Sequence, residues 1–180
     1  ETILMPRNVH ISVIKICALQ NIQPIFFDLD FSLETGHYKP ITKIWLENVF
    51  KKINFNEKKI VGVILVSPSY HGYAGDLEPL IDLCHQKNLP VLVDEAHGSY
   101  FLFCENLNLP KSAVLSNADL VVHSLHKSLN GLTQTAALWY KGNLVNEQNL
   151  IKSINLLQTT SPSALSVSYT HLRAHETDIN

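Results

Sequence analysis

The 180-residue sequence has few of the features that mark specialised classes of protein. Its three cysteines, Cys17, Cys84 and Cys104, are far apart and form no CxxC pair, which argues against a disulfide framework or a structural zinc site. We interpret them as buried thiols in a reducing cytoplasm. No apolar run approaches the roughly 18 residues that a membrane span needs. With 7 glycines and 8 prolines, the composition is neither collagen-like nor disordered.

Neither sign of charge is in large excess. The chain has 14 Lys and Arg against 16 Asp and Glu, a formal net charge of -2. Proteins that bind nucleic acid or anionic membranes need a basic surface, so we expect neither partner. The apolar content of 46% is that of an ordinary soluble globular protein. The length suits one domain, or a piece of a larger one.

Short apolar segments alternate with longer amphipathic ones. We expect a buried helix over 10–20, a loop over 30–40 and further helices over 42–52, 77–87 and 146–157. We expect strands over 3–5, 24–29, 60–66, 90–93, 118–122 and 133–140. Continuous apolar strands are typical of parallel sheets that are covered on both faces. The pattern therefore predicts an α/β fold, a mostly parallel sheet with helices on both faces.

Polar residues gather where the expected strands end, and ligand sites in such sheets lie at the carboxyl ends of the strands. Asp94 follows one apolar strand and Lys127 another. Pyridoxal phosphate needs both groups, an amine for its Schiff base and a carboxylate that keeps its pyridine nitrogen protonated. Ser124 and His126, close to Lys127, can donate hydrogen bonds to a phosphate. The sequence therefore predicts a pyridoxal phosphate site.

Each of these residues also has an ordinary structural explanation. Lys127 could lie on the surface, and Asp94 and Ser124 could cap turns. His126 could be a loop histidine with a partner of its own, and His97 a residue of the rim. Singly these explanations are adequate, but their coincidence at successive strand ends favours a site.

Six segments occur in the order seen in one enzyme family, at residues 7–12, 67–72, 93–98, 118–127, 132–136 and 156–163. Over residues 1–166 the sequence resembles the major domain of the pyridoxal-phosphate-dependent ornithine/lysine/arginine decarboxylases, within the aspartate-aminotransferase-like fold. Val9 and Ile11 stand where that family usually has Cys and Lys. The resemblance implies an incomplete PLP-dependent transferase-like major domain. The family's phosphate loop and small domain fall outside these residues.

The resemblance also implies roles for individual residues. Lys127 would carry the cofactor as a Schiff base, and Asp94 would pair with the ring nitrogen. The cofactor ring would lie between His10 and Ala96. Ser124 and His126 would contact the phosphate. His97 would lie at the border of the substrate pocket. No metal is implied.

The implied activity is the decarboxylation of arginine, lysine or ornithine to the amine and carbon dioxide, as in polyamine biosynthesis and amino-acid metabolism. The resemblance further implies a cytoplasmic homodimer, or a higher multiple, with residues 159–163 near the interface. Two alternatives stay open. The parent could be another enzyme of the same fold, an aminotransferase or a lyase, or the chain could be an inactive truncated piece.

The last residues, 167–180, resemble a translated sequencing adapter. We therefore expect them to be a non-native tail after a major-domain fragment at 1–166. His171, His175 and Glu176 have a spacing that could hold a metal on a helix, but we do not interpret them as ligands.

Overall fold

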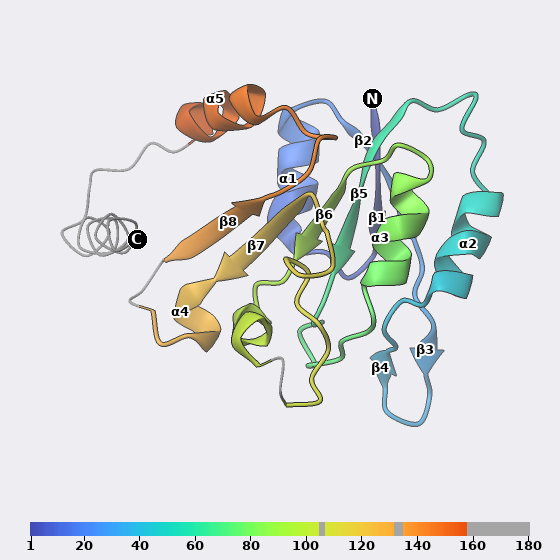
Figure 1. Cartoon of the computed structure of the whole chain (residues 1–180). Coiled ribbons are helices and arrows are strands. Elements are labelled where there is room, and N and C mark those ends of the chain that lie inside the picture. Colours follow the sequence, from blue (N-terminus) through green and yellow to red (C-terminus); the bar gives the residue numbers. More distant parts are fainter. Residues whose placement is uncertain (105–106, 132–134, 158–180) are drawn as a thin grey trace.

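A six-stranded sheet forms the centre of the protein (Figure 1), whose computed structural model describes residues 1–104, 107–131 and 135–157. The strand order is β2-β1-β5-β6-β7-β8, and only the pairing of β7 with β8 is antiparallel. This confirms the predicted mostly parallel sheet. The strands are β1 (Thr2–Pro6), β2 (Gln23–Phe27), β5 (Ile60–Val66), β6 (Val91–Asp94), β7 (Leu120–Ser124) and β8 (Ala136–Tyr140).

Helices cover both faces of this sheet, as the sequence predicts. In Figure 1, α1 (Ile11–Leu19) lies behind the sheet, and α2 (Lys43–Lys51) and α3 (Glu78–His85) lie in front of it. The long helix α5 (Glu147–Leu157) follows β8. Two short elements were not predicted, the 3-10 helix η1 (Ser99–Phe103) and the single turn α4 (Leu125–Ser128).

Two apolar clusters, one on each face, hold the layers together. The larger contains residues of α2 and α3 packed on the sheet, including Leu46, Leu80 and Val63. The smaller contains Cys17 of α1 and Ile64 of β5. Strand β5 supplies both clusters because successive side chains of a strand point to opposite faces. Its continuous apolar sequence therefore reflects burial on both sides, as expected.

Two expectations about secondary structure were wrong. The stretch 30–40 is not simply a loop, because β3 (Phe31–Ser32) pairs with β4 (His37–Tyr38) in a small antiparallel hairpin. Helix α1 is not buried as a whole: only Cys17 is, while Leu19 is 78% exposed. The side of α1 turned away from the sheet has no further layer over it in the described part of the chain, so its apolar sequence overstates its burial.

The predicted tail at 167–180, and with it the boundary at residue 166, lies outside the described residues. The same holds for 159–163. Within the described ranges, no helix is both long and apolar enough to cross a membrane.

Candidate functional site

The carboxyl ends of four neighbouring strands, β1, β5, β6 and β7, meet at one edge of the sheet because these strands are parallel and adjacent. A cleft of about 250 Å³ lies there. Residues from the end of each strand, or just after it, line it: Asn8, His10, Ser12, Val66, Pro68, Tyr70, Asp94, Ala96, His97, Val122, Ser124 and Lys127. The cleft therefore brings together six of the seven residues that the sequence singles out.

Asp94 and Lys127 enter the cleft from the adjacent strands β6 and β7. Asp94 is paired with Val122 in the sheet, and Lys127 follows five residues further on, in α4. The Asp94 Oδ1 atom accepts a hydrogen bond from the Ala96 backbone, at 3.1 Å, so the carboxylate does cap its turn. Its Oδ2 atom accepts none from the described residues and is left for a ligand.

The Lys127 amine lies 3.3 Å from Nε2 of His97, which also lines the cleft. Within the described chain, the ion pairs of lysine involve Lys39, Lys59 and Lys111, and none involves Lys127. Burial, followed by the positive charge of Lys127, lowers the pKa of His97, and the charge of Asp94 offsets this only in part. His97 therefore stays neutral to lower pH than an ordinary histidine and can accept a hydrogen bond from the lysine.

His10 precedes α1 and caps it. Its Nδ1 atom accepts from the Ser12 backbone amide at 3.3 Å and lies 2.8 Å from the Ser12 hydroxyl. These contacts orient the His10 ring, which lines the cleft. Ser12 itself lines the cleft and was not predicted, although it lies in the first of the six segments.

The two predicted phosphate contacts, Ser124 and His126, differ in their placement. Ser124 lines the cleft, and its hydroxyl makes no capping hydrogen bond, although the residue stands at the N-cap of α4. His126 is not among the described residues that line the cleft. Its Nδ1 atom lies 2.9 Å from the backbone carbonyl of Thr135, the arrangement of a loop histidine with a partner of its own.

Two further cleft residues were missed as individual candidates, Asn8 and Tyr70. The Asn8 Oδ1 atom is buried and has no hydrogen-bond partner among the described residues, which is an unfavourable state unless a ligand supplies a donor. Tyr70 is 82% exposed and its ring lies 5.7 Å from that of His97. Both belong to segments that carry the family resemblance, and this was the only signal for them in the sequence.

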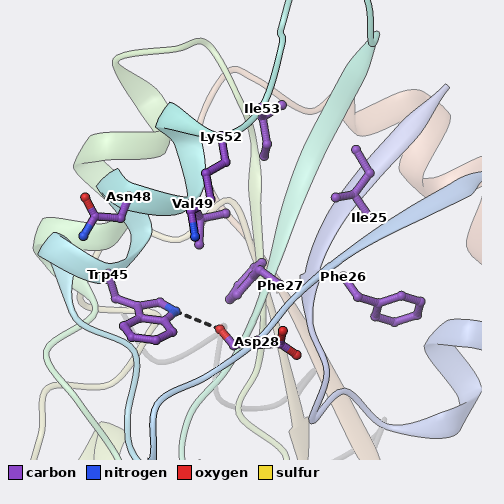
Figure 2. Close-up of a pocket in the computed structure, with 9 residues that line it drawn as sticks. All are labelled: Ile25, Phe26, Phe27, Asp28, Trp45, Asn48, Val49, Lys52 and Ile53. Atoms are coloured by element: carbon purple, nitrogen blue, oxygen red, sulfur yellow. Dashed lines mark hydrogen bonds between the residues drawn. The ribbon is translucent and has the colours of Figure 1, made fainter.

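A larger groove of about 400 Å³ lies beside the outermost strand β2, between β2 and α2 (Figure 2). Its lining is mostly apolar. The ionisable side chains there are Asp28, which is paired with Arg7, and Lys52. Trp45 Nε1 donates a hydrogen bond to the Asp28 carbonyl across this lining, at 2.7 Å. The groove lacks the convergent polar groups of the smaller cleft, so we take the smaller cleft as the candidate site.

Residues 1–177 match the family described as Orn/Lys/Arg decarboxylase, major domain. The chain belongs to this family. An arginine decarboxylase of Bacillus cereus is 37% identical over 163 residues, which are 91% of this chain and 34% of the relative. The chain spans about one third of the length of the curated relatives that it matches.

Solved structures show the same fold at low sequence identity. Mouse CSAD matches with a TM-score of 0.65 and 22% identity, over 91% of this chain and 33% of that one. A PLP-bound C-S lyase from Staphylococcus hominis matches with a TM-score of 0.64 and 16% identity, over 93% and 41%. These likenesses confirm the expected fold class, an α/β fold with a mostly parallel sheet and helices on both faces.

Proposed function

We propose that the protein to which this chain belongs is a pyridoxal-phosphate-dependent decarboxylase that converts a basic amino acid, arginine, lysine or ornithine, to its amine and carbon dioxide. Membership of the family supports this reaction. The observation that carries the proposal is the presence of Asp94, at the end of β6, and Lys127, just after the adjacent strand β7, in one cleft without an ion pair to any described residue. A carboxylate and an amine in this state are what the cofactor requires.

The described residues of the cleft fit this cofactor. Lys127 offers the amine that binds the cofactor's aldehyde. The free Oδ2 of Asp94 can accept from the protonated ring nitrogen. The Ser124 hydroxyl makes no capping hydrogen bond, so it can donate to the phosphate. The Asn8 Oδ1 atom has no hydrogen-bond partner among the described residues, so it can accept from a ligand. His10 and Ala96 line the cleft as the residues proposed to flank the ring.

The bound cofactor supplies an electron sink, which takes up the electron pair left behind when the substrate loses its carboxylate. Asp94 sustains that capacity by keeping the ring nitrogen protonated. Its carboxylate is well placed to do so because the backbone of Ala96 holds one oxygen, which fixes the orientation of the other.

Lys127 must lose a proton before its amine can act as a nucleophile. The neutral Nε2 of His97, at 3.3 Å, is an acceptor for that proton. The lowered pKa of His97 weakens it as a base but keeps its lone pair available at neutral pH. We therefore propose His97 as a group that orients the amine and shuttles its proton at the border of the substrate pocket.

A product assay on the full-length protein tests the reaction. Incubation with pyridoxal phosphate and with arginine, lysine or ornithine in turn should release carbon dioxide and the corresponding amine from one of the three. Formation of a keto acid in place of carbon dioxide would identify an aminotransferase and contradict the proposal. Release of a fragment of the substrate side chain would identify a lyase of another kind.

A further inference from the structure

Glu95, the neighbour of Asp94 in the sequence, is completely buried, with an exposed fraction of 0%. Three groups donate to its carboxylate: the Ser112 hydroxyl at 2.7 Å, the Ala113 amide at 2.9 Å and Nε2 of His123 at 2.7 Å. A buried carboxylate is strongly unfavourable without such donors. The structure therefore maintains a buried acidic group, with hydrogen bonds to both oxygens, next to a residue that lines the proposed cofactor cleft.

The contacts of His123 determine which of its nitrogens carries the proton. Trp139 Nε1 lies 2.9 Å from His123 Nδ1, and an indole N–H can only donate. Nδ1 must therefore present a lone pair, and the ring proton is on Nε2, facing Glu95. A doubly protonated His123 would set two N–H groups against each other at Trp139. His123 thus carries its single ring proton on Nε2 and donates it to Glu95.

This chain of donors, from Trp139 to His123 to Glu95, joins the strands β8, β7 and β6. It does so at the level where the cleft residues leave the sheet: Glu95 follows Asp94, and His123 precedes Ser124. A second link at this level is the hydrogen bond from the Glu95 amide to the Val122 carbonyl, at 3.0 Å. The buried side chains therefore connect the two strand ends that present Asp94 and Lys127.

We propose that Glu95, His123 and Trp139 form a positioning network that fixes Asp94 and Lys127 relative to each other for the cofactor. None of the three lines the cleft, so they act through their neighbours. This inference rests on the proposed function, because it concerns the geometry that pyridoxal phosphate requires. It adds residues to which the family resemblance, as read from the sequence, gave no role.

The chain contains a matched control at the other end of the same two strands. His85 Nε2 lies 2.8 Å from Asp119 Oδ2, which also accepts from the Val91 amide at 2.8 Å. Asp119 precedes β7, and Val91 begins β6. Here Asp119 links the starts of β6 and β7 through the Val91 amide, and its imidazole partner His85 comes from α3, away from the cleft.

The test compares Glu95→Gln with Asp119→Asn in the full-length protein. Glu95→Gln replaces one carboxylate oxygen by an NH₂ group. If that group takes the place of Oε1 it faces the Ala113 amide, and if it takes the place of Oε2 it faces Nε2–H of His123, so a donor meets a donor in both orientations. We expect the affinity for pyridoxal phosphate to fall by about tenfold or more, and the circular dichroism of the bound cofactor to weaken. Asp119→Asn should leave the cofactor dichroism unchanged and the affinity within about twofold, even at an equal loss of stability in urea.

Equal effects of the two substitutions on cofactor binding would overturn the positioning role, because the Glu95 network would then act only on stability. Unchanged binding and dichroism in a folded Glu95→Gln protein would overturn it as well. Should Glu95→Gln fail to fold, Trp139→Phe removes the donor to Nδ1 and keeps an aromatic ring at this position. It should weaken the cofactor dichroism, and an unchanged signal would contradict the inference.

An NMR measurement separates this inference from the proposed function. The ¹⁵N shifts of His123 in the wild-type protein should show a protonated Nε2 and an unprotonated Nδ1, with or without cofactor. The opposite tautomer, or a doubly protonated ring, would refute the network itself. A wild-type protein with the expected tautomer that binds no pyridoxal phosphate would refute the proposed function, and the positioning role with it.

Discussion

At each end of strands β6 and β7 a buried carboxylate is paired with an imidazole, but the surroundings of the two pairs differ. At the carboxyl end Glu95 binds His123, and at the amino end Asp119 binds His85. Around Asp119 the structure is closed: a Cβ atom on Gly142 would come within 2.9 Å of Asp119 Oδ1. Around Glu95 the chain leaves Asp94, Ser124 and Lys127 facing a cleft.

The difference shows that a buried carboxylate–imidazole pair does not by itself mark a site. The first pair connects the ends of β6 and β7, the second connects α3 to the start of β7, and both fit an ordinary structural role. The carboxyl end becomes a candidate site because polar groups next to the pair lack structural partners, such as one oxygen of Asp94 and the amide oxygen of Asn8. Polar groups left without partners are what a ligand requires.

Among substitutions that test this difference between the two strand ends, Asp94→Ala is expected to have the largest effect, a loss of turnover. Loss of the carboxylate removes the group that keeps the cofactor ring protonated, so turnover should fall by at least about 10²-fold, as when one electrostatic partner of a transition state is lost. Some cofactor binding should remain, because Lys127 is intact. Steady-state kinetics of the full-length variant measure this, and near-normal turnover would show that Asp94 does not have this role.

Next in size is the effect of Gly98→Ala, which tests how tightly the loop after β6 is packed beneath the cleft. A Cβ atom at this position would lie 2.5 Å from Pro68 Cδ and 2.9 Å from Glu95 Cγ. Such overpacking should lower the free energy of unfolding by about 1–3 kcal/mol. Urea denaturation followed by circular dichroism measures the change, and wild-type stability would mean that the loop yields without penalty.

At the amino end, His85→Ala should destabilise the protein by about 1–3 kcal/mol, because it removes one partner of a buried carboxylate. The Asp119 side chain is 2% exposed, whereas His85 is 31% exposed, so water can replace part of the lost contact and the lower half of this range is expected. Thermal or urea unfolding gives the value. Turnover of the folded variant should match that of the wild type. A large loss of turnover at equal stability would contradict the claim that only the carboxyl ends of β6 and β7 serve the site.

The smallest effects concern the pKa of His97, which two substitutions should move in opposite directions. Burial lowers it first, Lys127 lowers it further and Asp94 raises it. Lys127→Met should therefore raise the pKa of His97 towards that of an ordinary histidine, and Asp94→Asn should lower it further. NMR titration of the His97 ring measures both, and shifts of the same sign would mean that these charges do not act on His97 as the structure indicates.

Much of the fold could be predicted from local patterns. The apolar strand 60–66 and the stop signals at Asn88 and Pro90 depend on neighbouring residues alone, and Asn88 indeed adopts a positive φ of 56° after α3. The hairpin at 31–38 escaped prediction because its strands have only two residues each and carry no periodicity. The exposure of α1 also escaped, because an apolar sequence does not show what covers it.

Some residues in and around the site could likewise be predicted from local patterns, and others could not. Asp94, Lys127 and Ser124 could be predicted because each follows an apolar strand, and strand ends of a parallel sheet converge. Glu95 and His123 could not, since they are 28 residues apart and meet only through the pairing of β6 with β7. The contact of His126 with Thr135 likewise joins residues that are nine positions apart.

The proposal that Lys127 is the cofactor lysine can be tested most directly by chemical trapping. The full-length protein would be incubated with pyridoxal phosphate, reduced with borohydride, digested and analysed by mass spectrometry. We predict a phosphopyridoxyl adduct on Lys127, and none at any lysine in Lys127→Ala. An adduct on another lysine of the wild-type protein, with Lys127 unmodified, would contradict the account.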